Sequence, residues 1–266
     1  MAELRATRLS KRFSGLTVVS DVSLTIRPGE VVGYLGPNGS GKTTTARMIS
    51  GLLEPSAGKV EYNGADIHSD VITFHRHMGY VPEEPYLYPF LSGREYLNLV
   101  GRLRELPETL LASKIDGFLS LFNLSAAADQ SIASYSKGMR QKIVISAALL
   151  HDPAIVIFDE PETGLDVATT MMLRHLVRTL ASRGKAILYS SHILEVVERV
   201  CDRVIVLHKG VVVADDSIER LRTLSSTTSL EAVFSQLVIR DDPETVPRDL
   251  ADMAAMGAPS TVLRAG

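Results

Sequence analysis

The sequence of 266 residues has little of several features that define whole classes of protein. It has one cysteine, Cys201, so no intrachain disulfide can form, which favours a reducing compartment. Its longest apolar runs, such as residues 143–150, are far shorter than the roughly 20 residues that a membrane-spanning helix needs. Residues 1–6 lack the apolar segment of a secretory signal. We therefore expect a chain that does not cross a membrane by itself.

A surplus of charge is also lacking. Lys and Arg number 28 and Asp and Glu number 31, which gives a formal net charge of −3 at pH 7. Proteins that bind nucleic acid usually carry a basic surplus, so we expect no nucleic-acid partner. The acidic excess falls within residues 241–266, and residues 1–240 are balanced.

What the sequence does contain is an alternation of short β-rich runs with longer helical patterns. Buried-strand runs lie at 31–35, 155–158, 186–189 and 204–207. Such an alternation predicts an α/β fold with a mostly parallel sheet covered on both faces. In addition, Asn63-Gly64 predicts a two-residue hairpin turn.

The middle and the end of the chain depart from this alternation. Apolar residues recur at helical spacing within 95–106 and within 111–122, with Pro107 between them, which predicts a mostly helical insertion over about 92–134. Residues 241–266 combine Pro and Gly with small residues and predict a weakly ordered tail.

One glycine-rich stretch matches the phosphate-loop pattern G-x-x-x-x-G-K-[ST]. It consists of Gly36, Pro37, Asn38, Gly39, Ser40, Gly41, Lys42 and Thr43, followed by Thr44. Glycines let backbone N–H groups curl around phosphate oxygens, and a helix predicted over 44–53 points its positive end at the same anion. We expect Lys42 to reach the outer phosphates and the Thr43 hydroxyl to bind Mg²⁺.

Two acidic residues follow the apolar run 155–158. Asp159 is expected at the end of the strand, where it can hold the Mg²⁺. Glu160 can polarise the water that attacks the terminal phosphate. No Asn in the chain is followed by Lys, so the guanine-reading sequence Asn-Lys-x-Asp is absent.

Further motifs indicate which kind of nucleotide-hydrolysing protein the chain resembles. Residues 135–141, Tyr-Ser-Lys-Gly-Met-Arg-Gln, resemble the signature motif of the ABC (ATP-binding cassette) ATPases. The other motifs of that family follow in order: Phe13 at the position of the adenine-stacking aromatic, 79–84 as the Q-loop, 161–166 as the D-loop and 190–192 as the H-loop. The resemblance covers about residues 3–222.

The resemblance implies a P-loop NTPase (RecA-like) core with an N-terminal antiparallel β subdomain and a helical insertion subdomain. The ABC ATPase domain is then expected over 1–222, with the helical subdomain at about 84–152. A short C-terminal helical extension is expected over 223–240, before the tail at 241–266.

The resemblance also implies a mechanism. Two cassettes, expected to be a homodimer, would stack head to tail around MgATP. Ser136 and Gly138 of one chain would contact the phosphates bound by the other, and His192 would orient Glu160 or the water. Similarity to the exporter branch, in which ATPase and permease are separate chains, implies integral membrane permease subunits as partners. The protein would then sit at the cytoplasmic face of the cell membrane, powering export of a substrate.

Some positions allow more than one interpretation. Glu83 stands where the family has glutamine; a carboxylate can still bind Mg²⁺, but it adds charge near the terminal phosphate. Phe13 could be a core residue, His192 could simply begin a helix, and His75 with His77 could suggest a metal. Cys201 is expected to be a packed thiol. A second function that the family permits is that of a non-transport ABC ATPase, which uses ATP-driven dimerisation as an interaction module.

Overall fold

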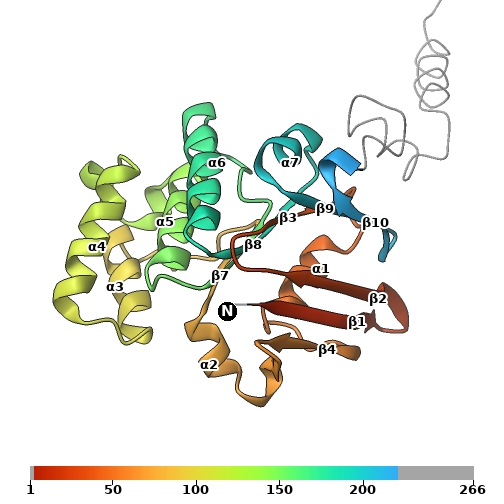
Figure 1. The fold of residues 1–266 in the computed structure, drawn as a ribbon. Helices are drawn as coiled ribbons and strands as arrows, with labels where there is room; N and C mark the ends of the chain where they lie inside the picture. The colour runs from red at the N-terminus through yellow and green to blue at the C-terminus, as the bar shows by residue number, and fades with distance from the viewer. Residues whose placement is uncertain (1–2, 221–266) are drawn as a thin grey trace, which may run out of the picture.

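The computed structural model describes residues 3–220, so the expectations for 223–240 and 241–266 lie outside the described part of the chain. Two sheets organise that part (Figure 1). One has four strands in the order β2-β1-β4-β5, and the other has six in the order β10-β9-β3-β8-β7-β6. Helices lie beside the larger sheet, and α3 and α4 form a separate lobe at its far side (Figure 1).

The six-stranded sheet confirms the expected α/β architecture. Its strands are β3 (Val31–Leu35), β6 (Met78–Val81), β7 (Ile155–Asp159), β8 (Ala186–Ser191), β9 (Arg203–His208) and β10 (Val211–Ser217). All neighbouring pairs are parallel except β9 with β10. Every residue of β3, β7 and β8 is buried, because both faces of a parallel sheet are covered and its strands are correspondingly apolar.

The four-stranded sheet is entirely antiparallel and is built from the N-terminal part of the chain. Its strands are β1 (Leu4–Phe13), β2 (Leu16–Ile26), β4 (Ala57–Tyr62) and β5 (Ala65–Asp66). Asn63 and Gly64 join β4 to β5, and both have positive φ, 51° and 84°. A type I′ turn requires positive φ at its two central residues, so the predicted hairpin is confirmed.

Helices flank the parallel strands. They are α1 (Lys42–Ile49), α2 (Val71–Arg76), α6 (Val167–Ser182) and α7 (Leu194–Val200), with short 3₁₀ turns at Ile67–Ser69, Ser125–Ala127 and Ile132–Ser134. The sequence predicted a helix over 44–53, but α1 begins and ends earlier. Gly51, with φ 71°, follows its C-cap Ser50, and such a left-handed glycine is a common helix stop.

Between β6 and β7 the chain is helical, in the segment where the insertion was expected. It holds α3 (Gly93–Leu103), α4 (Glu108–Leu121) and α5 (Lys137–Leu149). Helix α3 starts at a capping box, in which the Ser92 hydroxyl accepts from the Glu95 N–H and the Glu95 carboxylate accepts from the Ser92 N–H.

Two apolar cores lie on opposite faces of the parallel sheet. Alternate residues of one strand divide between them: Val31 and Leu35 belong to the core beneath the helices, and Val32 and Tyr34 to the core shared with the antiparallel sheet. Successive side chains of a strand point to opposite faces of the sheet. The parallel strands are therefore packed against one apolar core on each face. In residues 3–220 no helix has both the length and the apolar character needed to span a membrane.

Candidate nucleotide-binding site

The glycine-rich loop joins the carboxyl end of β3 to the start of α1. Gly39 and Gly41 have φ of 77° and 105°, a region that residues with a Cβ rarely adopt. Gly36 is required for a different reason, since a Cβ there would lie 2.4 Å from the Leu207 carbonyl oxygen. The loop therefore brings backbone N–H groups and the positive end of α1 to one point, which is an arrangement that binds anions.

Lys42 lies over this loop. Its Nζ donates to the Gly36 carbonyl oxygen at 2.8 Å and to the Pro37 carbonyl oxygen at 3.4 Å. The Ser40 hydroxyl is buried and has no hydrogen-bond partner among the described residues. A buried polar group without a partner is rare, and here it adds an unused donor to the loop.

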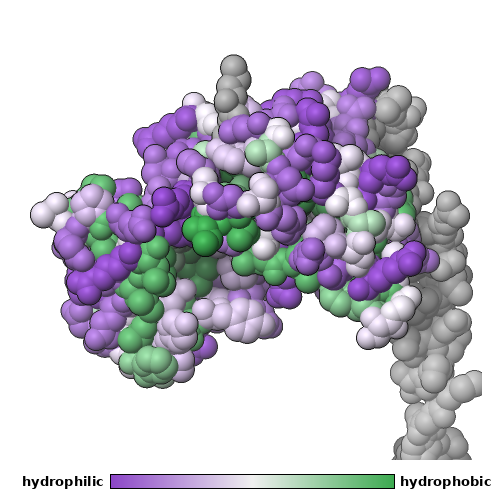
Figure 2. Space-filling model, turned by 90° about the horizontal axis from the view of Figure 1, so that it is seen from below, coloured by the Kyte–Doolittle hydropathy of each residue, from purple (hydrophilic) through white to green (hydrophobic). Residues whose placement is uncertain are grey.

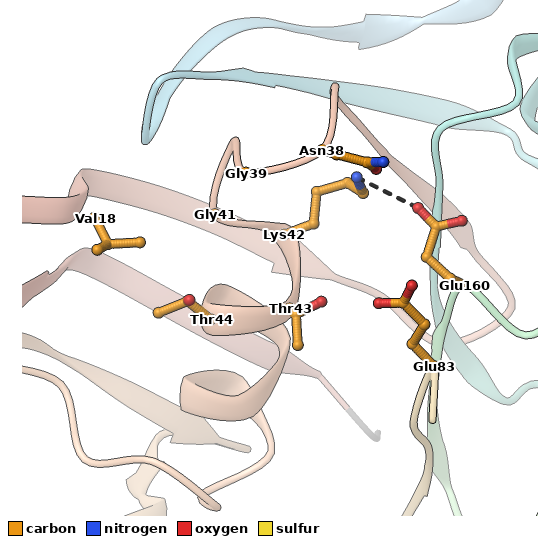
Figure 3. Close-up of a pocket in the computed structure, with 9 residues that line it drawn as sticks. All are labelled: Val18, Asn38, Gly39, Gly41, Lys42, Thr43, Thr44, Glu83 and Glu160. Carbon is orange, nitrogen blue, oxygen red and sulfur yellow. Dashed lines mark ion pairs between the residues drawn. The ribbon is translucent and has the colours of Figure 1, made fainter. Parts of the chain in front are cut away.

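A cavity of about 340 Å³ opens against the loop (Figure 3). Its lining residues are Val18, Asn38, Gly39, Gly41, Lys42, Thr43, Thr44, Glu83 and Glu160. In Figure 3 the carboxylates of Glu83 and Glu160 face Thr43 and Lys42 from the opposite wall. The cavity therefore combines a cationic loop with two carboxylates from other parts of the chain.

Glu160 follows β7 and has a left-handed backbone, with φ 48°. Its N–H donates to the Ser190 carbonyl and hydroxyl oxygens at 3.2 and 3.1 Å, which fixes this uncommon conformation. The carboxylate forms an ion pair with Lys42 at 3.3 Å and contacts His192 Nδ1 at 2.8 Å. The Lys42 and Glu160 side chains are each only 7% exposed, whereas the His192 side chain is half exposed.

Asp159 lies directly behind Glu160 and is fully buried. Its carboxylate accepts hydrogen bonds from the Ser190 hydroxyl at 2.6 Å and from the Tyr80 hydroxyl at 3.2 Å. Burial, and then the charge of Asp159, raise the pKa of Tyr80, so the phenol stays a neutral donor. Asp159 is thus held by β6 and β8, and it is not among the residues that line the cavity.

The signature segment begins α5. The Ser136 hydroxyl accepts from the Met139 N–H at 3.2 Å and caps the helix. Gly138 packs so closely on the D-loop segment that a Cβ there would lie 3.0 Å from the Gly164 carbonyl oxygen. From the same helix, Gln141 donates to the Pro161 carbonyl oxygen at 3.3 Å.

The structure brings half of the predicted site residues to the wall of one cavity. Gly36, Pro37 and Ser40 belong to the same loop without lining the cavity, and His192 reaches it only through its contact with Glu160. Phe13 ends β1, is 45% exposed and lies beneath the Lys11 ammonium, 5.4 Å from the ring centre. It is therefore not a core residue, nor does it line the cavity; neither do Ser136 and Gly138 of the same chain. Sequence reasoning missed Val18, an apolar residue of β2 that no motif marks and that the fold brings to the cavity.

Three further residues, His75, Cys201 and His192, are characterised by their surroundings. His75 contacts the Ser50 carbonyl oxygen at 2.8 Å, and residues 3–220 hold no group of three His, Cys, Asp or Glu side chains suited to a metal. Cys201 is buried, and its burial raises the pKa of the thiol, as expected for a packed, unreactive cysteine. His192 precedes α7, which begins at Leu194.

Comparison with known proteins supports the family resemblance seen in the sequence motifs. The family model described as "ABC transporter" matches residues 19–163. The ABC transporter ATP-binding protein NatA of Bacillus subtilis (strain 168) is 38% identical over 239 residues, which are 88% of this chain and 97% of that protein. A Nod factor export ATP-binding protein I, from Ralstonia nicotianae, is 35% identical over 81% of this chain and 67% of that protein.

A solved structure described as the ATP-binding subunit of an ABC transporter has a TM-score of 0.83 and 34% sequence identity, covering 88% of this chain and 98% of that one. The fold and the loop define a P-loop ATPase. Within that class, the chain belongs to the ABC transporter family as an ATP-binding subunit. Proteins of this family bind ATP and hydrolyse it.

Proposed function

We propose that this chain binds MgATP at the cavity beside α1 and hydrolyses it in a head-to-tail dimer, to power export through separate membrane permease subunits. The observation that carries the proposal is the contact set of Glu160, which joins Lys42 of the loop to His192 of the H-loop segment. These three side chains come from separate parts of the sequence. Lys42 and Glu160 line the cavity from opposite sides, and His192 contacts Glu160 from outside that cavity.

The loop supports phosphate binding. Gly39 and Gly41 offer backbone N–H groups, and Pro37, Asn38 and Ser40 complete the turn into α1, in which Ser40 N–H donates to the Pro37 carbonyl oxygen. Thr44 lies in the first turn of α1 and lines the cavity. Lys42 exchanges its carbonyl partners and Glu160 for phosphate oxygens, which frees the carboxylate. A carboxylate released from its lysine is a stronger base toward water.

Thr43, Glu83 and Asp159 would hold the Mg²⁺. All three offer oxygen, the donor that this ion prefers, and magnesium in nucleotide sites uses few protein ligands because phosphates and waters supply the rest. Thr43 and Glu83 line the cavity, and Asp159 lies behind Glu160, held by Ser190 and Tyr80. When bound, the ion would neutralise part of the negative charge of the phosphates.

Glu160 acts as the general base for the attacking water in this scheme, and His192 orients that carboxylate. The 2.8 Å contact between His192 Nδ1 and Glu160 supports this role. Positioned bases of this kind contribute about 10²–10⁴-fold to a rate. Phe13 would stack on the adenine, since its ring at the end of β1 is exposed; Lys11 lies over one face of the ring.

The second copy is expected to supply Ser136 and Gly138. The two residues stand at the start of α5, a helix of 13 residues whose positive end can face an anion bound by the partner. ATP would then bind two copies together, and hydrolysis would let them separate.

A groove between the core and the helical insertion supports the permease partner. A cavity of about 290 Å³ lies there, and apolar and aromatic side chains make up most of its wall: Leu52, Met78, Tyr80, Pro82, Tyr86, Tyr96, Val100, Val144, Ala147 and Ala148. Figure 2 shows apolar surface over the helical insertion and beside a hollow. A short helix from a membrane subunit would fit this surface, which supports a location at the cytoplasmic face of the membrane.

Co-purification tests the transport part of the proposal. The full chain carrying an affinity tag should be extracted from membranes in mild detergent together with a protein of several membrane spans, and Tyr86→Ala with Leu52→Ala should weaken that association. A matched pair of exposed apolar residues away from this groove, Leu16→Ala on β2 with Val211→Ala on β10, serves as the control. Recovery with soluble partners alone would favour a non-transport ABC ATPase.

A further inference from the structure

The D-loop carries a charged side chain that none of the roles above uses. Glu162 stands two residues after Glu160, and its side chain is only 13% exposed. Acidic residues are rarely buried without partners, because removing the charge from water is costly. Its surroundings therefore show what this carboxylate is for.

Two elements bind the Glu162 carboxylate. Arg174 of α6 donates from Nε at 2.9 Å and from Nη2 at 3.1 Å, in a two-point contact. Tyr189 of β8 donates from its hydroxyl at 2.8 Å to Glu162 Oε1. A planar guanidinium paired with a carboxylate has one favoured geometry, so Glu162 is held in a defined position between α6 and β8.

The Tyr189 contact leads directly to the hydrolytic residues. Tyr189 is fully buried and packs its ring against Phe158, the residue before Asp159. The next residue along β8, Ser190, donates to Asp159 and receives the Glu160 N–H, and His192 follows two residues later. A shift of Tyr189 would therefore move the strand end that sets the position of both Glu160 and His192.

Glu162 also lines a second cavity, of about 380 Å³, on the other side of Glu160. Its wall includes Glu160, Ser191, His192 and Thr170. Glu162, Glu160 and His192 thus surround one space, although the D-loop and the H-loop segment are about thirty residues apart in the sequence.

We propose that Glu162 is a positioning residue for ATP hydrolysis: through Tyr189 and Arg174 it fixes the D-loop against β8 and α6, and thereby sets the geometry of Glu160 and His192. This inference rests on the proposed function, because it assumes that Glu160 and His192 carry the hydrolysis. Misplacing a reacting group by about 1 Å can cost ~10²-fold in rate, so a small movement is sufficient.

The test uses the full chain and measures kcat, KM and nucleotide affinity. Glu162→Ala should lower kcat by about 10- to 10²-fold and leave KM for ATP within about twofold. Glu162→Gln keeps an acceptor for the Tyr189 hydroxyl and should lose less, and Tyr189→Phe should fall between them. The matched control is Arg178→Ala. Arg178 lies on α6 one turn after Arg174 and forms an ion pair with Asp202. Loss of this ion pair should leave kcat unchanged.

A combined variant separates positioning from general stability. If Glu162 acts by positioning Glu160 and His192, adding Glu162→Ala to a variant that already carries Glu160→Gln and His192→Ala should lower kcat by less than twofold more, because coupled residues are not additive. Additive losses, or a normal kcat in Glu162→Ala, would overturn the inference. A normal kcat in His192→Ala itself would instead overturn the proposed function.

Discussion

The phosphate loop forms one wall of the cavity, and Glu160 brings the cluster at the ends of β7 and β8 to the opposite wall. The loop and the cluster are built in different ways. The loop is continuous in sequence and relies on backbone N–H groups, glycine conformations and one lysine. The opposite cluster joins side chains from distant segments, in which Glu160 contacts His192 and Ser190 contacts Asp159. The residues that bind phosphate are thus close together in the sequence, whereas the residues proposed for hydrolysis come together only because β7 and β8 pair in the sheet.

The difference also appears in how each wall tolerates change. The loop cannot accept a Cβ at Gly36, because backbone atoms stand in its way. The cluster is held by hydrogen bonds and ion pairs between side chains, and a substituted side chain can keep some of these contacts. Changes in the loop should therefore affect nucleotide binding, and changes in the cluster should affect turnover.

The largest effect is expected from Lys42→Ala, which removes the only side-chain cation lining the cavity in the described part of the chain. Nucleotide binding, measured by calorimetry, should fall below detection, and hydrolysis with it. Lys59→Ala is the control, since Lys59 forms an exposed pair with Glu61 on β4. Unchanged binding in Lys42→Ala would contradict the assignment of the phosphate site.

Next in size is Glu160→Gln, which keeps the shape of the side chain and removes its charge. Hydrolysis should drop by about 10²–10⁴-fold while ATP still binds, because the general base is lost and the loop is intact. The variant should also accumulate as an ATP-bound dimer, detectable by size-exclusion chromatography with light scattering. Glu108→Gln is the control, because this exposed carboxylate on α4 pairs with Arg102, far from the phosphate loop in the fold. A normal rate of hydrolysis would exclude Glu160 as the base.

A smaller effect is expected from Gly36→Ala, which sharpens the distinction between the two walls. Its Cβ would meet the Leu207 carbonyl oxygen at 2.4 Å and the Ser40 hydroxyl at 2.5 Å, so the loop must shift. Overpacking of this kind costs about 1–3 kcal/mol, and we expect ATP affinity to weaken by about 10-fold or more with kcat at saturation less affected. Gly117→Ala in α4 is the matched control, because a Cβ there meets nothing within 4 Å. Equal affinity in the two variants would show that the loop is not rigid.

The smallest effect is expected at His151, which lies outside the cavity. It concerns how the stability of the fold changes with pH. Burial, followed by the charge of Arg104, lowers the pKa of His151 to about 4. Its Nε2 contacts the Met78 carbonyl oxygen at 3.1 Å, and its buried Nδ1 has no partner among the described residues, so the folded imidazole is neutral with its proton on Nε2. Between pH 6.5 and about 4 the unfolded chain binds the proton and the folded chain does not.

The folded state should therefore lose stability as pH falls through that window, by about 1–2 kcal/mol from this group, because partial exposure to solvent reduces the full effect of the shift. Urea unfolding at pH 7 and pH 5 measures the loss. His151→Gln keeps a donor for the Met78 carbonyl and should show a flatter pH dependence. His68→Gln is the control on an exposed 3₁₀ turn. An unchanged slope in His151→Gln would exclude this histidine as the cause.

Most of the fold could be predicted from the sequence because local patterns carry it. The buried runs became β3, β7, β8 and β9, the Asn63-Gly64 turn formed the expected hairpin, and the helical spacing near Pro107 became α3 and α4. The error at the end of α1 arose because apolar residues continue to Leu53, while the left-handed Gly51 stops the helix.

The phosphate loop was determined by the sequence itself, since glycine conformations, the lysine and the helix start lie within nine consecutive residues. What the tertiary structure decided is which distant side chains meet that loop. Parallel pairing of β7 with β8 places Glu160 beside Ser190 and His192, and the turn after β6 brings Glu83 to the same cavity. The contacts of Glu162 with Arg174 and Tyr189 belong to this second kind, because hydrogen bonds between separate elements depend on packing that no local pattern records.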